Sequence, residues 1–205
     1  MPNTSRDGSP SFIHTARRAQ LIECAVDAIA ELGLAQASTV RIAERAEVSR
    51  GVLTYHFRDR AELIEQVIAR VYDLGGEFIL PRMARASSPR ESLLEFIGGS
   101  VEMYAAYPRH MAALAAIFGA AAGDAGVERV RHQRHAQEML DLGRILRDGQ
   151  RQRIFRDFDI VVMSRAIRGA LDTALMHVVK GGGVEPFASE LKSIFDAATA
   201  AVGKS

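Results

Sequence analysis

The sequence lacks the features of an extracellular, membrane-spanning or disulfide-stabilised protein. It has a single cysteine, Cys24, so no disulfide can form within the chain and a reducing compartment is expected. No apolar run approaches the roughly 18 residues that a transmembrane helix needs. Residues 1–14 are polar and contain no apolar stretch of the kind found in signal peptides. We therefore expect a cytoplasmic protein without a membrane span, in which residues 1–14 form a flexible N-terminal arm.

Motifs for catalysis are missing as well. The chain contains no Gly-x-Ser-x-Gly, His-Glu-x-x-His or Cys-x-x-Cys pattern. The triple glycine at 181–183 follows a helical pattern, which indicates a helix end and a linker rather than a phosphate-binding loop. Glu128, His132 and His135 could share one helix face as part of a metal site, although a solvated charged face explains them better. We expect no catalytic residue, no cofactor and no metal.

Composition is that of a folded domain but says little about partners. Apolar residues make up 48% of the 205 residues, which is ordinary for a globular protein and too high for a disordered one. The 26 basic and 25 acidic residues leave a net charge of +1, so the overall charge indicates no class of partner. A binding function must therefore be sought in local patterns.

Helical periodicity extends over nearly the whole chain. Apolar residues between 21 and 32 recur at the spacing of one helix face, and Gly33 follows as a stop signal. Ser88-Pro89-Arg90-Glu91 is a capping box with proline at the first helical position. The alternation typical of strands is missing, so we predict an all-α fold. Further apolar helical patterns cover about 89–106, 109–122, 127–148, 158–179 and 186–202.

Two short helices with a tight turn between them predict a helix-turn-helix. The first runs over about 38–46 with Ser38 as its N-cap, and the second over 50–56 with Ser49 as its N-cap. A longer helix begins near Asp59 and reaches at least Leu74, before Gly75–Gly76 and Pro81 bend or end it. The small core of this motif is predicted to consist of Ile42, Ala43, Val48, Leu53 and Phe57.

The second short helix also has residues that are not needed for this core and that can face solvent. Arg50, Gly51, Thr54 and Tyr55 share one side, with His56 at the end. They combine hydrogen-bond donors, an aromatic face and, at Gly51, room for close backbone approach, which suits a helix in the DNA major groove. The local charge over residues 41–60 is only +2, so affinity would depend on geometry and dimerisation. The alternative is a solvated helical hairpin without a ligand.

The segment from about Thr15 to Val67 resembles the DNA-binding domain of the TetR (tetracycline-repressor) family. The resemblance is carried by LIECAVDAIAELG, STVRIAERAEVS and RGVLTYHFRDRAELI. It departs from the family pattern at Glu47, where glycine is usual and a positive φ would be strained, and at Arg60, where lysine is usual. The resemblance implies DNA contacts by Thr39, Ser49, Arg50, Gly51, Thr54, Tyr55, His56 and Arg60.

The rest of the chain matches that family in layout only, as a larger helical domain that binds a ligand and dimerises. Methionines and aromatics on apolar helix faces can line a cavity for a small, mainly apolar effector, although most such residues are simply core. Arg168 and Asp172 are spaced for an ordinary helix salt bridge, and the histidines are individually weak candidates. The candidate ligand contacts are Phe96, Met103, Tyr104, Tyr107, His110, Met111, Phe118, Arg168, Asp172, Met176 and His177.

The last two helical patterns have broad apolar faces, and the resemblance implies that they pack against their counterparts in a homodimer interface. A single recognition helix reads few bases, and a two-fold dimer on a palindrome solves this. The same faces could instead be buried within one protomer. We thus predict an arm (1–14), a helix-turn-helix domain (15–74) and an effector-binding and dimerisation domain (75–205).

On this interpretation the chain is a transcriptional regulator that binds double-stranded operator DNA, and a small effector releases it as a repressor. The rival hypotheses are a helical small-molecule-binding protein or enzyme without specific DNA binding, and a scaffold with neither property.

Overall fold

The computed structural model describes residues 10–120 and 125–201, and in this part of the chain the regular secondary structure is α-helical. The predicted all-α fold is confirmed. Between described residues, strand-like pairing is limited to an isolated bridge between Phe155 and Ala200. The helices are α1 Pro10–Leu32, α2 Thr39–Arg45, α3 Arg50–His56, α4 Arg60–Met83, α5 Pro89–Ala106, α6 Pro108–Ala120, α7 Ala125–Arg151, α8 Ile160–Val179 and α9 Glu185–Thr199.

The serine caps expected from the sequence are present. The Ser38, Ser49 and Ser88 side chains each accept a hydrogen bond from the backbone N–H three residues further on, which satisfies a donor that the first helical turn leaves free. The capping box of α5 differs in one detail. The carboxylate of Glu91 accepts hydrogen bonds from the backbone N–H and the hydroxyl of Ser87, both at 2.7 Å, instead of reaching the backbone of Ser88.

The first helix begins earlier than predicted. Helix α1 starts at Pro10, a residue favoured at the first helical position, so residues 10–14 of the expected arm are helical; residues 1–9 lie outside the described residues. Aromatic packing explains the extension, because the His14 ring lies 4.5 Å from the His56 ring and 5.8 Å from the Tyr55 ring, centroid to centroid. The N-terminal turns of α1 are thereby tied to α3.

Helix α4 also differs from the prediction at its glycines. It passes through Gly75–Gly76 without a break and ends at Met83, two residues after Pro81. Helix α5 packs alongside at this point, since a Cβ built on Gly75 would make an ordinary contact of 3.7 Å with the Met103 methyl group. The boundary expected at residue 75 therefore falls inside a continuous helix that contacts both α1 and the other helices of the bundle.

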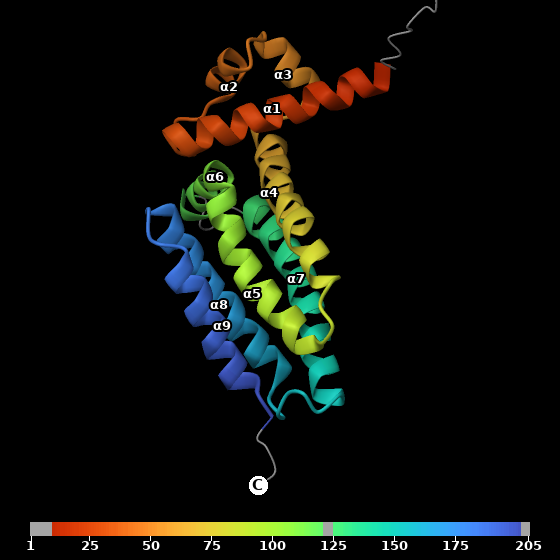
Figure 1. Cartoon of the computed structure of the whole chain (residues 1–205). Coiled ribbons are helices and arrows are strands. Elements are labelled where there is room, and N and C mark those ends of the chain that lie inside the picture. Colours follow the sequence, from red (N-terminus) through yellow and green to blue (C-terminus); the bar gives the residue numbers. More distant parts are fainter. Residues whose placement is uncertain (1–9, 121–124, 202–205) are drawn as a thin grey trace, which may run out of the picture.

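Figure 1 shows α1 lying across one end of a bundle made by the long helices α4 to α9, with α2 and α3 on the outer side of α1. The predicted core of the helix-turn-helix forms as expected: Ile42, Ala43, Leu53 and Phe57 are buried and Val48 is half-buried. Cys24 is half-buried, and burial raises the pKa of its thiol. None of the helices in the described ranges is long and apolar enough to cross a membrane.

Two contacts join α1 to α6 across the end of the bundle. Arg109 pairs with Asp27 at 2.7 Å, and Nε2 of His110 lies 2.9 Å from a carboxylate oxygen of Glu23. Glu23 is also paired with Arg70 of α4 at 3.1 Å. The position of α1 is therefore fixed by polar contacts with both α4 and α6.

Candidate nucleic-acid interface and internal cavity

Helix α3 presents one polar and aromatic face to solvent. Leu53 faces the core, which leaves Arg50, Gly51, Thr54 and Tyr55 exposed. Tyr55 is the most exposed large apolar side chain among the described residues, at 76% of its full accessibility. Its ring meets the rings of His14 and His56 edge-on, and the rest of this flat aromatic side chain is available to a partner.

The turn before α3 holds a strained residue. Glu47 has a φ of 53°, in the left-handed region that non-glycine residues occupy at a cost. The strain suspected from the sequence is thus present. The turn brings Ser49 to the start of α3 and leaves it exposed, while Thr39 at the start of α2 is half-buried. Helices α2 and α3 both lie on the outer side of α1 (Figure 1).

The two remaining predicted DNA contacts are engaged within the protein. The His56 ring is buried beside the rings of His14 and Tyr55, and burial lowers the pKa of its imidazole. Its Nδ1 has no hydrogen-bond partner among the described residues. The guanidinium of Arg60 donates to the carbonyl oxygens of Leu34 and Ala37 in the loop after α1. Phosphate contacts by His56 and Arg60 stay predictions.

Arg18 of α1, which the sequence did not indicate as a functional residue, holds the C-terminal end of α3 in place. Its guanidinium carbon lies 4.3 Å from the centre of the Phe57 ring, and it donates to the backbone carbonyl of His56. It also pairs with Glu62 at 2.8 Å. Glu62 in turn accepts hydrogen bonds from the backbone N–H and Nε of Arg58, at 2.9 and 3.1 Å. This cluster joins α1, the end of α3 and the start of α4.

Replacing Glu62 by glutamine is expected to destabilise the protein at neutral pH by on the order of 2 kcal/mol. The hydrogen bond from Arg18, helped by those from Arg58, lowers the pKa of Glu62 from 4.5 to about 2. A lowered pKa means that the stabilisation is present above about pH 4.5 and is lost as the pH falls toward 2. Urea denaturation of both proteins between pH 3 and 8 should therefore show a difference in the free energy of unfolding that becomes smaller as the pH falls. If this difference did not change with pH, the ionised Glu62 carboxylate would not be the source of the stabilisation.

A cavity of about 730 Å³ lies within the bundle. It is lined by residues of α4, α5, α6, α7 and α8, and its walls are mainly apolar. Its volume falls within the range of about 300–1,000 Å³ that is usual for small-molecule sites. The apolar and aromatic side chains that line it include Val71, Ile79, Leu80, Met83, Phe96, Met103, Met111, Leu114, Phe118, Leu142 and Leu175.

The structure brings some of the predicted ligand contacts together at this cavity and places the others elsewhere. Tyr107 packs edge-to-face against Phe78, and His110 is bonded to Glu23 of α1. Met176 is exposed, while the His177 ring stacks on Phe187 with the centroids 4.5 Å apart. These four do not line the cavity. Those that do are Phe96, Met103, Tyr104, Met111, Phe118, Arg168 and Asp172.

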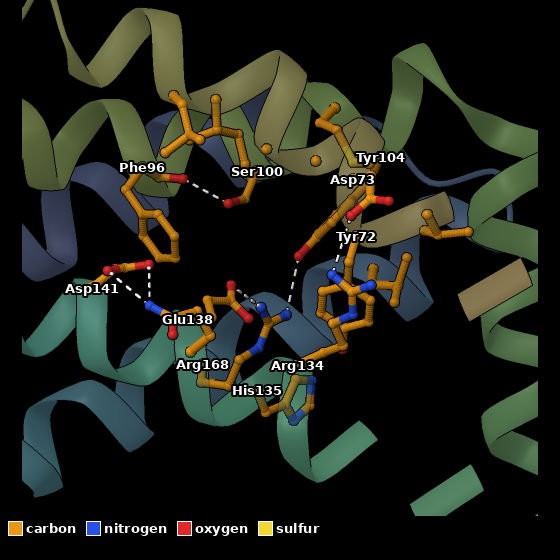
Figure 2. A pocket seen from close by; sticks show the side chains of 18 of the residues that line it. Tyr72, Asp73, Phe96, Ser100, Tyr104, Arg134, His135, Glu138, Asp141 and Arg168 are labelled. Carbon is orange, nitrogen blue, oxygen red and sulfur yellow. Dashed lines mark hydrogen bonds and ion pairs between the residues drawn. The ribbon is translucent and has the colours of Figure 1, made fainter. Parts of the chain in front are cut away.

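A polar cluster centred on Arg168 occupies one wall of the cavity (Figure 2). The guanidinium donates to Asp172 at 2.9 Å, which confirms the salt bridge expected from their spacing, and to Glu138 of α7 at 2.7 Å. It also donates to the hydroxyl of Tyr104 at 3.1 Å. Burial raises the pKa of Glu138 against the lowering effect of Arg168. A charged cluster thus lies in an otherwise apolar cavity.

Helix α7 supplies cavity residues that the sequence analysis did not propose. Arg134, His135, Glu138, Asp141 and Leu142 all line the cavity. Their spacing of three and four residues places them on one helix face, and this spacing could have revealed them. The high charge of the helix concealed the pattern, because charged residues are usually solvated. Within the described ranges, no three side chains of metal-ligand type converge, so Glu128, His132 and His135 do not form a metal site there.

Helix α8 exposes a narrow stripe of small and apolar residues. Val162, Ala166, Gly169, Thr173 and Met176 are all exposed, and their alternating spacing of four and three residues aligns them along the helix. A Cβ built on Gly169 would have no atom within 4 Å. Helix α9 lies beside α8 at the outer side of the bundle (Figure 1) and exposes Ile194. Small residues in a row allow another helix to approach closely.

Comparison with known proteins gives matches to both parts of this architecture. Residues 21–67 match the family described as bacterial regulatory proteins, tetR family. The chain is 36% identical over 87 residues to the HTH-type transcriptional regulator BetI 1 of Chromohalobacter salexigens, a match that covers 42% of this chain and 43% of the relative. It is 35% identical over 88 residues to BetI of Yersinia pestis, with 42% and 44% covered. The match thus spans less than half the length of these relatives.

The whole fold is similar to that of solved regulators. A transcriptional regulator of Pseudomonas aeruginosa superposes with a TM-score of 0.78 at 19% identity, covering 90% of each chain. A TetR-family regulator of a Rhodococcus species gives 0.77 at 21% identity, covering 89% of this chain and 98% of the other. A regulator of Saccharomonospora viridis, solved in complex with choline, gives 0.77 at 17% identity, covering 91% and 98%. At these identities the similarity concerns the fold alone.

Proposed function

We propose that the chain is a homodimeric, DNA-binding transcriptional regulator of the tetR family of bacterial regulatory proteins, whose family model residues 21–67 match. The observation that carries the proposal is the exposed face of α3, with Arg50, Gly51, Thr54 and Tyr55 held on a capped helix-turn-helix. The alternative of a helical binding protein or enzyme leaves this face without a role. A bacterial regulator of this kind would act in the cytoplasm, where the DNA lies.

Helix α3 is proposed to enter the DNA major groove, which is about 12 Å wide and admits one helix. Arg50 can donate to a guanine edge or a phosphate, and Gly51 lets the backbone approach closely. The Tyr55 hydroxyl suits a phosphate oxygen, as do Thr39 and Ser49 at the starts of α2 and α3. These contacts are local to one half-site, so a second copy is needed for a site long enough to be specific.

The exposed stripe of α8, together with α9, supports a two-fold dimer. Val162, Ala166, Gly169, Thr173 and Met176 would pack against the same residues of a second protomer, because a two-fold interface uses one surface twice. Two recognition helices placed about 34–36 Å apart would then read successive turns of a palindromic operator. The helix-turn-helix domain (15–74) would bind DNA, and the larger domain (75–205) would form the dimer.

The cavity is proposed to bind a small, mainly apolar effector that releases the DNA. Its walls include α4 and α6, and these two helices hold Glu23 of α1 through Arg70 and His110. A ligand that favours a different position of α4 or α6 would change the spacing of the two α3 helices. Operator and effector would then weaken each other's binding by the same factor, which is the behaviour of a repressor.

The test is selection of DNA from a random pool on the purified full-length protein, followed by sequencing. We expect a palindromic motif with half-site centres about one helical turn apart. Without enrichment at low salt, the proposal would fail and a DNA-independent binding protein would take its place. A motif without two-fold symmetry would contradict the dimer while leaving DNA recognition in place.

A further inference from the structure

The cavity wall has more carboxylates than cations to neutralise them. Asp73 pairs with Arg134 at 3.1 Å, Glu77 with Arg70 at 3.2 Å, and Asp141 with Arg144 at 3.0 Å. The remaining lining acids, Glu138 and Asp172, share the single guanidinium of Arg168. With both carboxylates ionised, this last cluster has a net charge of −1. The described lining residues therefore include no arginine or lysine without a carboxylate partner.

The Arg168 cluster is also short of a hydrogen-bond donor. One oxygen of Glu138 accepts from Arg168, while Oε2 is buried and has no partner among the described residues. The guanidinium is committed to Asp172, Glu138 and the Tyr104 hydroxyl. A buried carboxylate oxygen without a donor is costly, and a positive group brought into the cavity would offset that cost.

Aromatic rings border the same wall. Tyr72, Tyr104, Phe96 and Phe118 line the cavity, and Figure 2 shows Tyr72, Tyr104 and Phe96 around the Glu138 and Arg168 side chains. The electron-rich faces of aromatic rings attract a weakly hydrated cation, most strongly where water is excluded. The other walls are aliphatic, with Leu114, Leu142 and Leu175 among them, and would surround an apolar body.

We propose that the natural ligand of this cavity is an amphiphilic cation, with an apolar body and a positively charged head beside Glu138 and the tyrosines. The inference rests on the proposed function, since it takes the cavity to be the effector site. It also excludes a class: an apolar carboxylate would bring a second excess negative charge to a wall whose arginines are already paired. A neutral amphiphile would fill the apolar part but gain nothing from the carboxylate.

The inference is tested with three probes that share a ten-carbon chain and differ only in the head group: decyltrimethylammonium, decan-1-ol and decanoate. Each is titrated calorimetrically into the full-length protein below its micelle-forming concentration. We expect decyltrimethylammonium to bind at least about tenfold more tightly than decan-1-ol, and decanoate to bind more weakly than either. Equal binding of the cation and the alcohol, tighter binding of decanoate, or no binding of any probe would overturn the inference.

Variants locate the charge that selects the cation. Glu138→Gln keeps the size of the side chain and removes its charge, and should abolish most of the preference for the cation over the alcohol. Asp172→Asn tests the same cluster if the first variant fails to fold. Glu44→Gln, the same change at an exposed position of α2, should bind all three probes as the parent does. Unchanged cation preference in both folded cavity variants would overturn the assignment.

Acidification gives a second readout. Burial raises the pKa of Glu138, and its surroundings include Tyr72 from α4, Tyr104 from α5, His135 and Asp141 from α7, and Arg168 and Asp172 from α8. Protonation of Glu138 removes the excess negative charge, so affinity for the cation should fall as the pH drops through that raised pKa, and the Glu138→Gln variant should lack this component.

Failure here is distinguishable from failure of the proposed function. Selection of operator DNA uses the surface of α3 and needs no ligand. If the protein selects a palindrome but prefers decan-1-ol or decanoate, the proposed class of ligand is wrong, whereas the proposed function as a DNA-binding regulator is supported. If decyltrimethylammonium binds with the expected preference but no DNA is selected, the cavity is a cation site in a protein of another kind.

Discussion

Changing Thr54 and Tyr55 together to alanine is expected to weaken binding to the selected operator by at least about 100-fold. Both side chains lie on the exposed face of α3, and Tyr55 is 76% exposed. A good base contact is worth about 1–3 kcal/mol, and a dimer makes each contact twice. Fluorescence anisotropy on the operator and on a scrambled duplex of equal length would measure the loss and its sequence dependence.

The double variant should still fold, because Thr54 makes only local hydrogen bonds to the carbonyls of Arg50 and Gly51. Tyr55→Ala removes edge contacts with the rings of His14 and His56, while the contact between those two rings remains. A matched control changes His132 and Gln133 to alanine, since both are exposed on α7. The control should bind operator as the parent does. If the Thr54 and Tyr55 variant retained operator affinity, α3 would not be the recognition helix. Tyr55→Phe would then show how much of any loss belongs to the hydroxyl.

Gly169→Arg is expected to convert the protein to a folded monomer and to lower operator affinity by at least about 100-fold at nanomolar protein. Nothing in the protomer lies within 4 Å of the Cβ position of Gly169, so the new side chain fits the isolated chain. It would, however, place a charged group at the centre of the α8 stripe, where a partner helix must approach closely. Sedimentation velocity and the operator titration would measure both effects.

Gly119→Arg is the matched control, because Gly119 of α6 is also exposed and its Cβ position also has no atom within 4 Å. Both changes exchange a helical glycine for arginine, so they share the effect on helix propensity. Only Gly169→Arg should change the sedimentation coefficient. A dimer that survives this substitution would place the interface elsewhere and would remove the support that α8 gives to the palindrome.

Local chemistry explains how much of the fold could be predicted. Helix starts at Ser38, Ser49 and Ser88 follow from capping, which needs only a side chain and the backbone three residues away. The long helices follow from apolar periodicity, since a helix that packs on a bundle must bury one stripe. The strained turn at Glu47 followed from the expectation of a positive φ. None of these features depends on a distant part of the chain.

The features that escaped prediction depend on tertiary contacts. Helix α1 extends to Pro10 where His14 meets the rings of α3, 41 and 42 residues further along the chain. Arg18 meets Glu62 across a gap of 44 residues. The cavity joins residues of five helices, so periodicity could suggest Met103 and Met111 but could not separate them from exposed Met176. A helix face is visible in sequence, whereas the neighbour that covers it is not.

The neighbouring residues His110 and Met111 of α6 contact different structures. Met111 lines the cavity, while His110 is bonded to Glu23 of α1. Helix α6 thus contacts both the cavity and α1 through adjacent residues. Substitutions between α1 and α6 could therefore adjust how strongly the protein responds without altering which compound fits or which bases are read. In such a molecule, the strength of the response to a ligand can evolve separately from the specificity for that ligand and for the operator.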